Sequence, residues 1–155
     1  MNYITRAGYD KISQQIKQLY NIDVANAIHD IERARENGRL DENEEFHQAK
    51  AHKEQIENRI EDLRTSLAAH EIFNGVITTD VIGFGSCATI EDENGKVRTL
   101  TIVSSLEPDL KLGRVSTASP IGSSLIGCKV GEIIEVETPS GTISYEILSI
   151  TKGDI

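Results

Sequence analysis

The chain has 155 residues, of which 38% are apolar and 26% charged, so it is long enough for one or two globular domains. No run of 18 apolar residues occurs, which excludes a membrane-spanning helix. The net charge of −9 argues against ordinary binding of duplex DNA, because such binding needs lysine and arginine side chains to neutralise phosphates. An acidic protein can still act on nucleic acid where a partner supplies the phosphate-binding surface.

Two further features concern the cellular compartment. The first residues lack a basic segment followed by an apolar one, so we expect no secretory signal and a cytoplasmic location. Cys87 and Cys128 do not have Cys-x-x-Cys spacing. They are therefore predicted to be reduced, small core side chains rather than a disulfide or part of a zinc site.

The composition changes near residue 74. Only two of the 12 glycines and none of the three prolines precede this point. The later residues contain short alternating runs of β-branched side chains, which are typical of strands. The sequence therefore predicts a helical domain at residues 1–74 and a second domain at residues 75–155.

Side chains between residues 46 and 67 recur at alternating steps of three and four. This spacing is that of an a/d heptad seam and predicts a helix that packs along one side against another helix. The one charged seam position is Lys53, whose aliphatic stem can lie along the seam while its ammonium group reaches water. The seam positions are Phe46, Ala49, Lys53, Ile56, Ile60, Leu63 and Leu67.

The first 35 residues show the same spacing with one interruption. The phase shifts after Leu19, as it does at a coiled-coil stutter. The predicted seam consists of Tyr9, Ile12, Ile16 and Leu19 before the shift, and of Ala25, Ile28, Ile31 and Arg35 after it.

A short tip loop at residues 37–45 separates the two predicted helices. Gly38 suits the end of the first helix, and Asp41 with Glu44 forms a capping-box pattern at the start of the second. Helices joined by so short a loop must run antiparallel. With about 30 residues each, they would form a hairpin about 45 Å long, too thin to enclose a pocket.

The second domain is predicted to be a small β-sheet with one short helix. Thr138-Pro139-Ser140-Gly141 is a hairpin turn signal, and Ser119-Pro120 opens a short helix that ends before Gly127. The predicted strands are residues 86–92, 98–104, 114–117, 132–137 and 142–150. The fold class is therefore α+β, with an N-terminal antiparallel two-helix coiled-coil hairpin and a C-terminal antiparallel sheet.

The tip loop carries four carboxylates, which have two interpretations. Acidic residues are favoured at a helix N-terminus by its dipole and its cap. Carboxylate oxygens are also the ligands that Mg²⁺ prefers, and a few of them on a solvated loop would need a second protein to complete the site. The four residues are Asp41, Glu42, Glu44 and Glu45.

The segment from Ala34 to His47 resembles the tip motif of bacterial Gre transcript cleavage factors of the GreA type, A-R-x-x-G-D-L-x-E-N-A-E-Y. The resemblance extends, in order, over essentially the whole chain. Its other elements are Thr5-x-x-Gly8-Tyr9, Ser119-Pro120-Ile121-Gly122, Leu125-Ile126-Gly127, Gly131-Glu132 and Thr138-Pro139-Ser140-Gly141. The last four resemble the FKBP-like C-terminal domain of the same family.

The resemblance implies a function in transcription elongation. Gre factors bind bacterial RNA polymerase with the C-terminal domain at the rim of the secondary channel, and their coiled coil reaches the active site. There, tip acids help to hold a Mg²⁺ ion and position the water that cleaves the 3′ end of backtracked RNA. It implies no enzyme activity and no cofactor of the protein's own, and we expect a monomer. Glu42 corresponds to the family's glutamate as a catalytic residue and Mg²⁺ ligand, and Asp41, which matches no acid of the pattern, is the candidate to replace its aspartate in both roles. Ser119, Pro120, Ile121 and Gly122 are the candidate polymerase contacts.

One tip residue departs from the Gre pattern. Glu42 matches the family's glutamate, but Arg39 occupies the position of its aspartate. A cation there should repel Mg²⁺ and could pair with RNA phosphate, so Arg35 and Arg39 are candidate RNA contacts. We therefore expect weakened cleavage stimulation with retained polymerase binding. The alternative is a Gre-like secondary-channel inhibitor that does not stimulate cleavage.

Functions of other classes fit the sequence less well. A peptidyl-prolyl isomerase needs an aromatic-lined pocket, and only Phe84 and Tyr145 are aromatic after residue 74. A coiled-coil chaperone should present apolar side chains at its tip, whereas this tip is acidic. His47 and His52 lie five residues apart and so do not share a helix face as paired metal ligands would.

Overall fold

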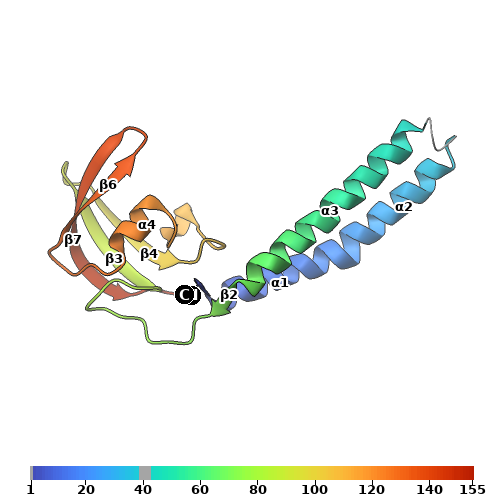
Figure 1. Cartoon of the computed structure of the whole chain (residues 1–155). Coiled ribbons are helices and arrows are strands. Elements are labelled where there is room, and N and C mark those ends of the chain that lie inside the picture. The colour runs from blue at the N-terminus through green and yellow to red at the C-terminus, as the bar shows by residue number, and fades with distance from the viewer. Residues whose placement is uncertain (1, 39–42) are drawn as a thin grey trace. The chain divides into compact units, whose positions relative to one another are not determined.

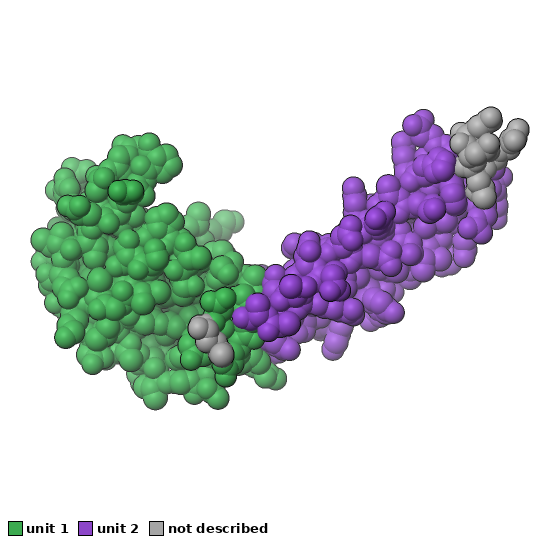
Figure 2. Space-filling model, in the orientation of Figure 1, with its two compact units in different colours: residues 1–8, 70–155 green, residues 9–69 purple. Residues whose placement is uncertain are grey.

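The structure, a computed structural model, describes residues 2–38 and 43–155. They form two compact units, which Figure 2 colours separately. One unit contains residues 9–69, and the other joins the N-terminal residues up to Gly8 to residues 70–155. The N-terminal residues belong with the second unit because strand β1 (Asn2–Ile4) pairs in parallel with strand β2 (His70–Ile72).

The helical unit is a two-helix hairpin (Figure 1). Its first arm is a continuous helix made of three consecutive segments, and its second arm is α3, which packs against α2. The 25 residues of α3 make it about 37 Å long, shorter than predicted. The elements are α1 (Arg6–Gln18), the π-helical turn η1 (Leu19–Asp23), α2 (Val24–Arg35) and α3 (Glu44–Ala68).

The heptad seam predicted for the second arm is confirmed. All seven seam positions of α3 are buried or half-buried, whereas Ser66 is the only other residue of α3 that is not exposed. Lys53 is half-buried and its ammonium group reaches Glu57 at 3.1 Å. The apolar spacing alone therefore identified the side of α3 that packs in the hairpin.

After the phase shift, the seam predicted for the first arm is wrong at three of its four positions. Ala25, Ile28 and Arg35 are exposed, and of the four residues only Ile31 is partly covered. The buried residues are instead Ala27 and Ala34. A strict heptad continued from Leu19 would bury positions 26 and 33. The π-turn η1 moves the seam one residue further, to Ala27 and Ala34, whereas the predicted seam assumes a shift of two.

The second unit contains a five-stranded sheet with the order β5-β4-β3-β7-β6. The predicted α+β class is confirmed, and the sheet is antiparallel as predicted except at one edge, where β5 pairs in parallel with β4. Residues 104–113, which include the 3₁₀ turn η2 (Leu110–Leu112), carry the chain back so that β5 can run in the same direction. The strands are β3 (Ser86–Asp92), β4 (Val97–Val103), β5 (Arg114–Ser116), β6 (Ile133–Thr138) and β7 (Gly141–Lys152).

One apolar core holds this unit together. Helix α4 (Pro120–Leu125) buries Leu125 in the core, which also contains Ile90, Ile102 and Ile147. Tyr3, Phe73 and Phe84 form a separate aromatic cluster, with ring centroids 5.0–5.9 Å apart. No helix within residues 2–38 and 43–155 has the length and apolarity needed to cross a membrane.

Candidate functional site at the end of the hairpin

Some of the predicted tip residues belong to the part of the chain that the structure describes, and others do not. Arg39, Asp41 and Glu42 lie outside the described residues, so their roles as RNA contact and as Mg²⁺ ligands stay predictions. The described residues on either side are the end of α2 with Asn37 and Gly38, and the start of α3 from Asn43. Gly38 and Asn43 thus bound the acidic segment in the sequence.

The start of α3 is capped by Asn43. Its backbone is extended, with φ −89° and ψ 94°, and its side-chain oxygen accepts a hydrogen bond from the Phe46 backbone N–H at 3.0 Å. The predicted capping box of Asp41 and Glu44 is therefore wrong, because Glu44 is the first residue of α3 and Asn43 is its cap. Asparagine caps helices as well as aspartate does, so the spacing of acidic residues predicted Asp41 as the cap where the structure has Asn43.

Two side-chain hydrogen bonds connect the arms of the hairpin at this end. The Asn43 amide nitrogen donates to the backbone carbonyl of Ala34, the second-last residue of α2. The Asn37 amide nitrogen donates to Glu45 Oε2 at 3.1 Å. The end of α2 and the start of α3 are thus joined by polar contacts as well as by apolar packing.

Phe46 forms the apolar base of the tip. It is 7% exposed, and two cations lie near its ring: the Arg35 guanidinium carbon at 5.8 Å and the Lys50 ammonium at 5.5 Å from the ring centroid. Both distances are within the range of a cation–π interaction. Arg35 is exposed, so this contact leaves its proposed pairing with RNA phosphate open as a prediction.

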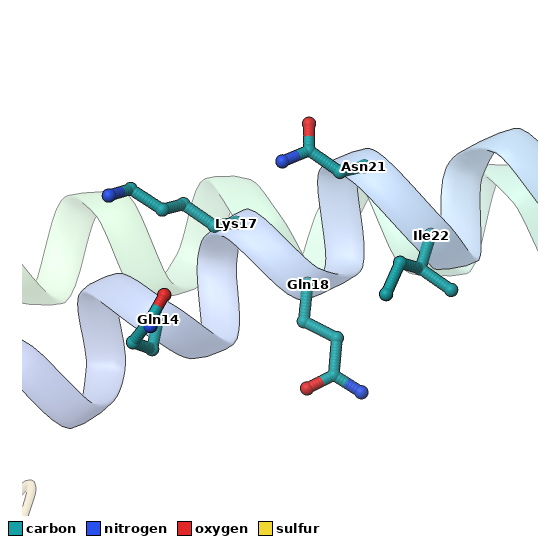
Figure 3. A pocket seen from close by; sticks show the side chains of 5 residues that line it. All are labelled: Gln14, Lys17, Gln18, Asn21 and Ile22. Carbon is teal, nitrogen blue, oxygen red and sulfur yellow. The ribbon is translucent and has the colours of Figure 1, made fainter.

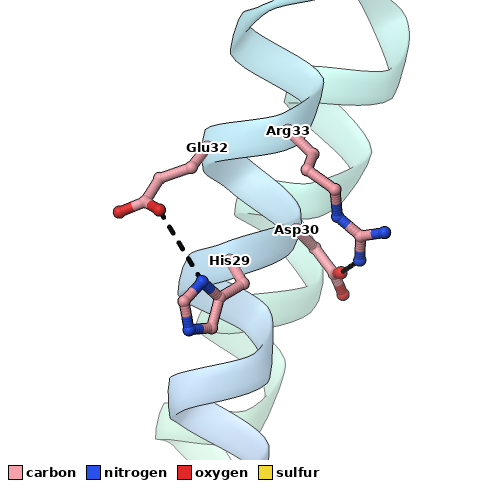
Figure 4. Close-up of polar contacts among 4 residues, drawn as sticks. All are labelled: His29, Asp30, Glu32 and Arg33. Atoms are coloured by element: carbon pink, nitrogen blue, oxygen red, sulfur yellow. Dashed lines mark hydrogen bonds and ion pairs between the residues drawn. The ribbon is translucent and has the colours of Figure 1, made fainter.

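Charged side chains continue along α2 away from the tip. Arg33 pairs with Asp30 at 2.6 Å, and His29 lies 3.7 Å from Glu32 (Figure 4). All four are exposed, so these pairs contribute little to stability. Arg33, Asp30 and Asn37 also line a shallow groove together with Glu45 and Ala49.

A second shallow groove lies beside the π-turn (Figure 3). Polar side chains line most of it, and Ile22 is its one apolar member. A third groove, in the second unit, is lined by Glu91, Asp92, Glu93 and Glu146 with Ile133, Ser144 and Tyr145. This acidic lining does not resemble the aromatic pocket that an isomerase needs.

Across residues 2–38 and 43–155, no group of three or more histidine, cysteine, aspartate and glutamate side chains could hold a metal ion. Glu44 and Glu45 are exposed in the first turn of α3, where the helix dipole favours negative charge. The carboxylate oxygens of Glu44 and Glu45 are of the kind that suits Mg²⁺, but these two side chains cannot complete a Mg²⁺ site without further ligands.

The predicted polymerase contacts Ser119, Pro120, Ile121 and Gly122 lie at the start of α4. The Ser119 hydroxyl oxygen accepts from the Gly122 backbone N–H at 3.0 Å and donates to the Ser116 carbonyl at 2.7 Å. A Cβ atom at Gly122 would lie 2.0 Å from that same carbonyl oxygen. Ser119 and Gly122 thus have structural tasks, whereas Pro120 is exposed.

Comparison with known proteins identifies the class of this protein. Residues 2–72 match the family described as transcription elongation factor, N-terminal, and residues 77–152 match transcription elongation factor, GreA/GreB, C-term. The protein named transcription elongation factor GreA from Paracoccus denitrificans is 38% identical over 148 residues, 95% of each chain. Its namesake from Rhodospirillum rubrum is 37% identical over 152 residues, 97% of each chain.

A solved structure is also similar. GreA factor homolog 1 of Thermus thermophilus is 27% identical, with a TM-score of 0.43, and the match covers 97% of this chain and 99% of that one. The family matches and the curated relatives define a transcription elongation factor. The chain belongs to the GreA/GreB family, which confirms the resemblance found in its sequence.

Proposed function

We propose that this protein binds bacterial RNA polymerase through the secondary channel and stimulates cleavage of backtracked RNA at its 3′ end. The observation that carries the proposal is a two-helix hairpin whose connecting segment contains Asp41 and Glu42. The membership in the GreA/GreB family supports it. In this proposal the protein is not an enzyme, because the hydrolytic centre belongs to the polymerase.

Asp41 and Glu42 would act as ligands to a Mg²⁺ ion shared with the polymerase. When bound, Mg²⁺ polarises phosphate oxygens and lowers the pKa of a coordinated water. The task of the protein's own side chains is to place two carboxylates at the end of a narrow arm. Because Asn43 caps α3, the cap does not require Asp41. Asp41 can therefore serve as a ligand without competition from capping.

Arg39 should weaken this activity. A cation at the position where the Gre pattern has an aspartate removes one potential Mg²⁺ ligand and repels the ion. A guanidinium can instead pair with a phosphate of the transcript, as can that of Arg35. In this proposal the protein binds the polymerase but stimulates RNA cleavage less than a variant with aspartate at position 39 would.

The second unit would provide the docking surface on the polymerase. Pro120 is exposed at the start of α4, on a backbone held by the Ser119 cap and by the close approach of Gly122 to Ser116. A Pro120→Ala substitution should weaken binding to the polymerase while the fold is retained. Equal affinity of the wild-type and Pro120→Ala proteins would remove Pro120 from the proposed contact.

The decisive experiment uses a stalled, backtracked elongation complex and follows the length of its RNA with and without the protein. We expect weak stimulation by the wild type, stronger stimulation by Arg39→Asp and none by Glu42→Ala. The Glu54→Ala variant, at an exposed position of α3, is a matched control and should behave as wild type. Slower elongation without any cleavage would instead indicate a channel inhibitor.

A further inference from the structure

Asn43 contacts both arms of the hairpin with different atoms of one side chain. Its amide oxygen accepts from the Phe46 backbone N–H at the start of α3, and its amide nitrogen donates to the Ala34 carbonyl in the last turn of α2. The Ala34 carbonyl also accepts the Asn37 backbone N–H at 3.1 Å. Ala34 is fully buried, so this carbonyl belongs to a packed part of the hairpin.

The two contacts of Asn43 have different chemical requirements. Capping needs only an acceptor oxygen, which aspartate and serine supply equally well. The contact with Ala34 needs a donor, which an ionised aspartate lacks, and serine is one atom shorter than asparagine. Capping therefore explains the contact of the Asn43 amide oxygen, but not the hydrogen bond from its amide nitrogen to α2.

We propose that Asn43 is a positioning residue for the acidic segment of the tip. In the sequence, Asp41 and Glu42 lie between the end of α2 and Asn43. The bond from Asn43 to Ala34 ties the residue that directly follows Glu42 in the sequence to the last turn of α2. The Asn37–Glu45 hydrogen bond is a second, exposed tie between the same ends. This inference rests on the proposed function, because positioning matters only if the carboxylates act.

The inference is tested with Asn43→Asp, which keeps the acceptor for the cap but lacks a donor, and with Asn43→Ser, which keeps the acceptor but is one atom shorter and so does not reach the Ala34 carbonyl. Asn58→Ser, at an exposed position of α3, is the matched control. For each protein, RNA cleavage in a backtracked complex is measured over a range of factor concentrations, which separates the saturating rate from the half-saturating concentration. Hydrogen exchange of the amides of residues 36–38 and 46 is measured on the free proteins.

We expect both Asn43 variants to lower the saturating rate by about tenfold or more, since displacement of a reacting group by about 1 Å costs up to about 100-fold. The half-saturating concentration should not change, because polymerase docking is assigned to the second unit. Exchange should quicken at residues 36–38 while the Phe46 amide stays protected by the retained cap. A merely structural role would instead release Phe46 or raise the half-saturating concentration.

Two results would contradict different parts of this reasoning. If the wild type stimulates cleavage and both Asn43 variants reach its saturating rate, the positioning role is wrong and the proposed function stands. If neither the wild type nor Arg39→Asp stimulates cleavage, the proposed function is wrong and the positioning role falls with it.

Discussion

The π-turn η1 leads to a prediction about chain length in the hairpin. The buried seam of the first arm runs from Ile12 to Ala34, a separation of 22 residues, whereas the seam of α3 runs from Phe46 to Leu67, a separation of 21. The π-turn accommodates this one extra residue. Deletion of Asn21, an exposed residue of η1, should therefore convert the turn to α-helix and restore a strict heptad.

The magnitude follows from what each deletion does to the seam. After loss of Asn21, the half-buried Val24 moves into a seam position, and the free energy of unfolding should change by no more than about 1 kcal/mol. Deletion of Asn58 from α3 instead rotates Ile60, Leu63 and Leu67 by about 100°. Exposing three such side chains costs about 1.5–3 kcal/mol each, or roughly 5–9 kcal/mol in total. That loss is comparable with the whole stability of a typical domain, about 5–15 kcal/mol.

The two deletions are compared by thermal unfolding followed by far-ultraviolet circular dichroism, which reports mainly on the helical unit. The protein without Asn21 should unfold within about 8 °C of the wild type, and the protein without Asn58 should lose most of its cooperative helical transition. Equal destabilisation by the two deletions would refute the interpretation that η1 absorbs a surplus residue.

Two further predictions concern the second unit. Gly122→Ala should lower its stability by about 1–3 kcal/mol, because the added Cβ atom overlaps the Ser116 carbonyl; faster hydrogen exchange in β6 and β7 would report this, and unchanged exchange would contradict it. Burial raises the pKa of the Cys128 thiol above its ordinary value of 9.0, and the hydrogen bond and negative charge of Glu132 raise it further. In a Cys87→Ser background, alkylation of Cys128 should therefore increase only above pH 9.0, and Glu132→Gln should shift that increase to lower pH. The raised pKa also makes stability depend on pH, because the Cys128 thiol ionises at a lower pH in the unfolded protein than in the folded one. Its contribution to the free energy of unfolding is therefore present below pH 9.0 and is lost as the pH rises through the folded pKa.

The helical seam shows what sequence spacing can predict and where it fails. In α3 every step is three or four residues, so one continuous face is defined and the buried residues could be identified in advance. In the first arm the spacing showed that the phase shifts after Leu19 but not by how much. Large apolar side chains suggested Ile28, whereas the structure buries the small Ala27, which allows the two helices to approach closely. The size of the phase shift depends on packing against the partner helix, so it cannot be predicted from the spacing of apolar residues within one helix.

The strand segments of the second unit were also predictable, because turn residues and alternating side chains mark them locally. Their order was not. The parallel pairing of β4 with β5 depends on the path of residues 104–113, and nothing in the alternation within a strand specifies its neighbour's direction. The parallel pair β1–β2 is likewise set by a contact between residues almost 70 positions apart, as in Asn2 with His70.

The reassignment of the α3 cap to Asn43 makes the role of Asp41 testable against Arg39. If Asp41 supplies the ligand that Arg39 cannot, Asp41→Ala should abolish stimulation of RNA cleavage in the wild-type background. In the Arg39→Asp background another carboxylate is available, so the same substitution should cost little. The two substitutions should thus be strongly non-additive, as expected of residues that serve one site. The measurement is the saturating cleavage rate of the four proteins in one backtracked complex. If Asp41→Ala instead lowers that rate by the same factor in both backgrounds, Asp41 does not replace the missing aspartate, and Glu42 would be the sole remaining ligand among the two.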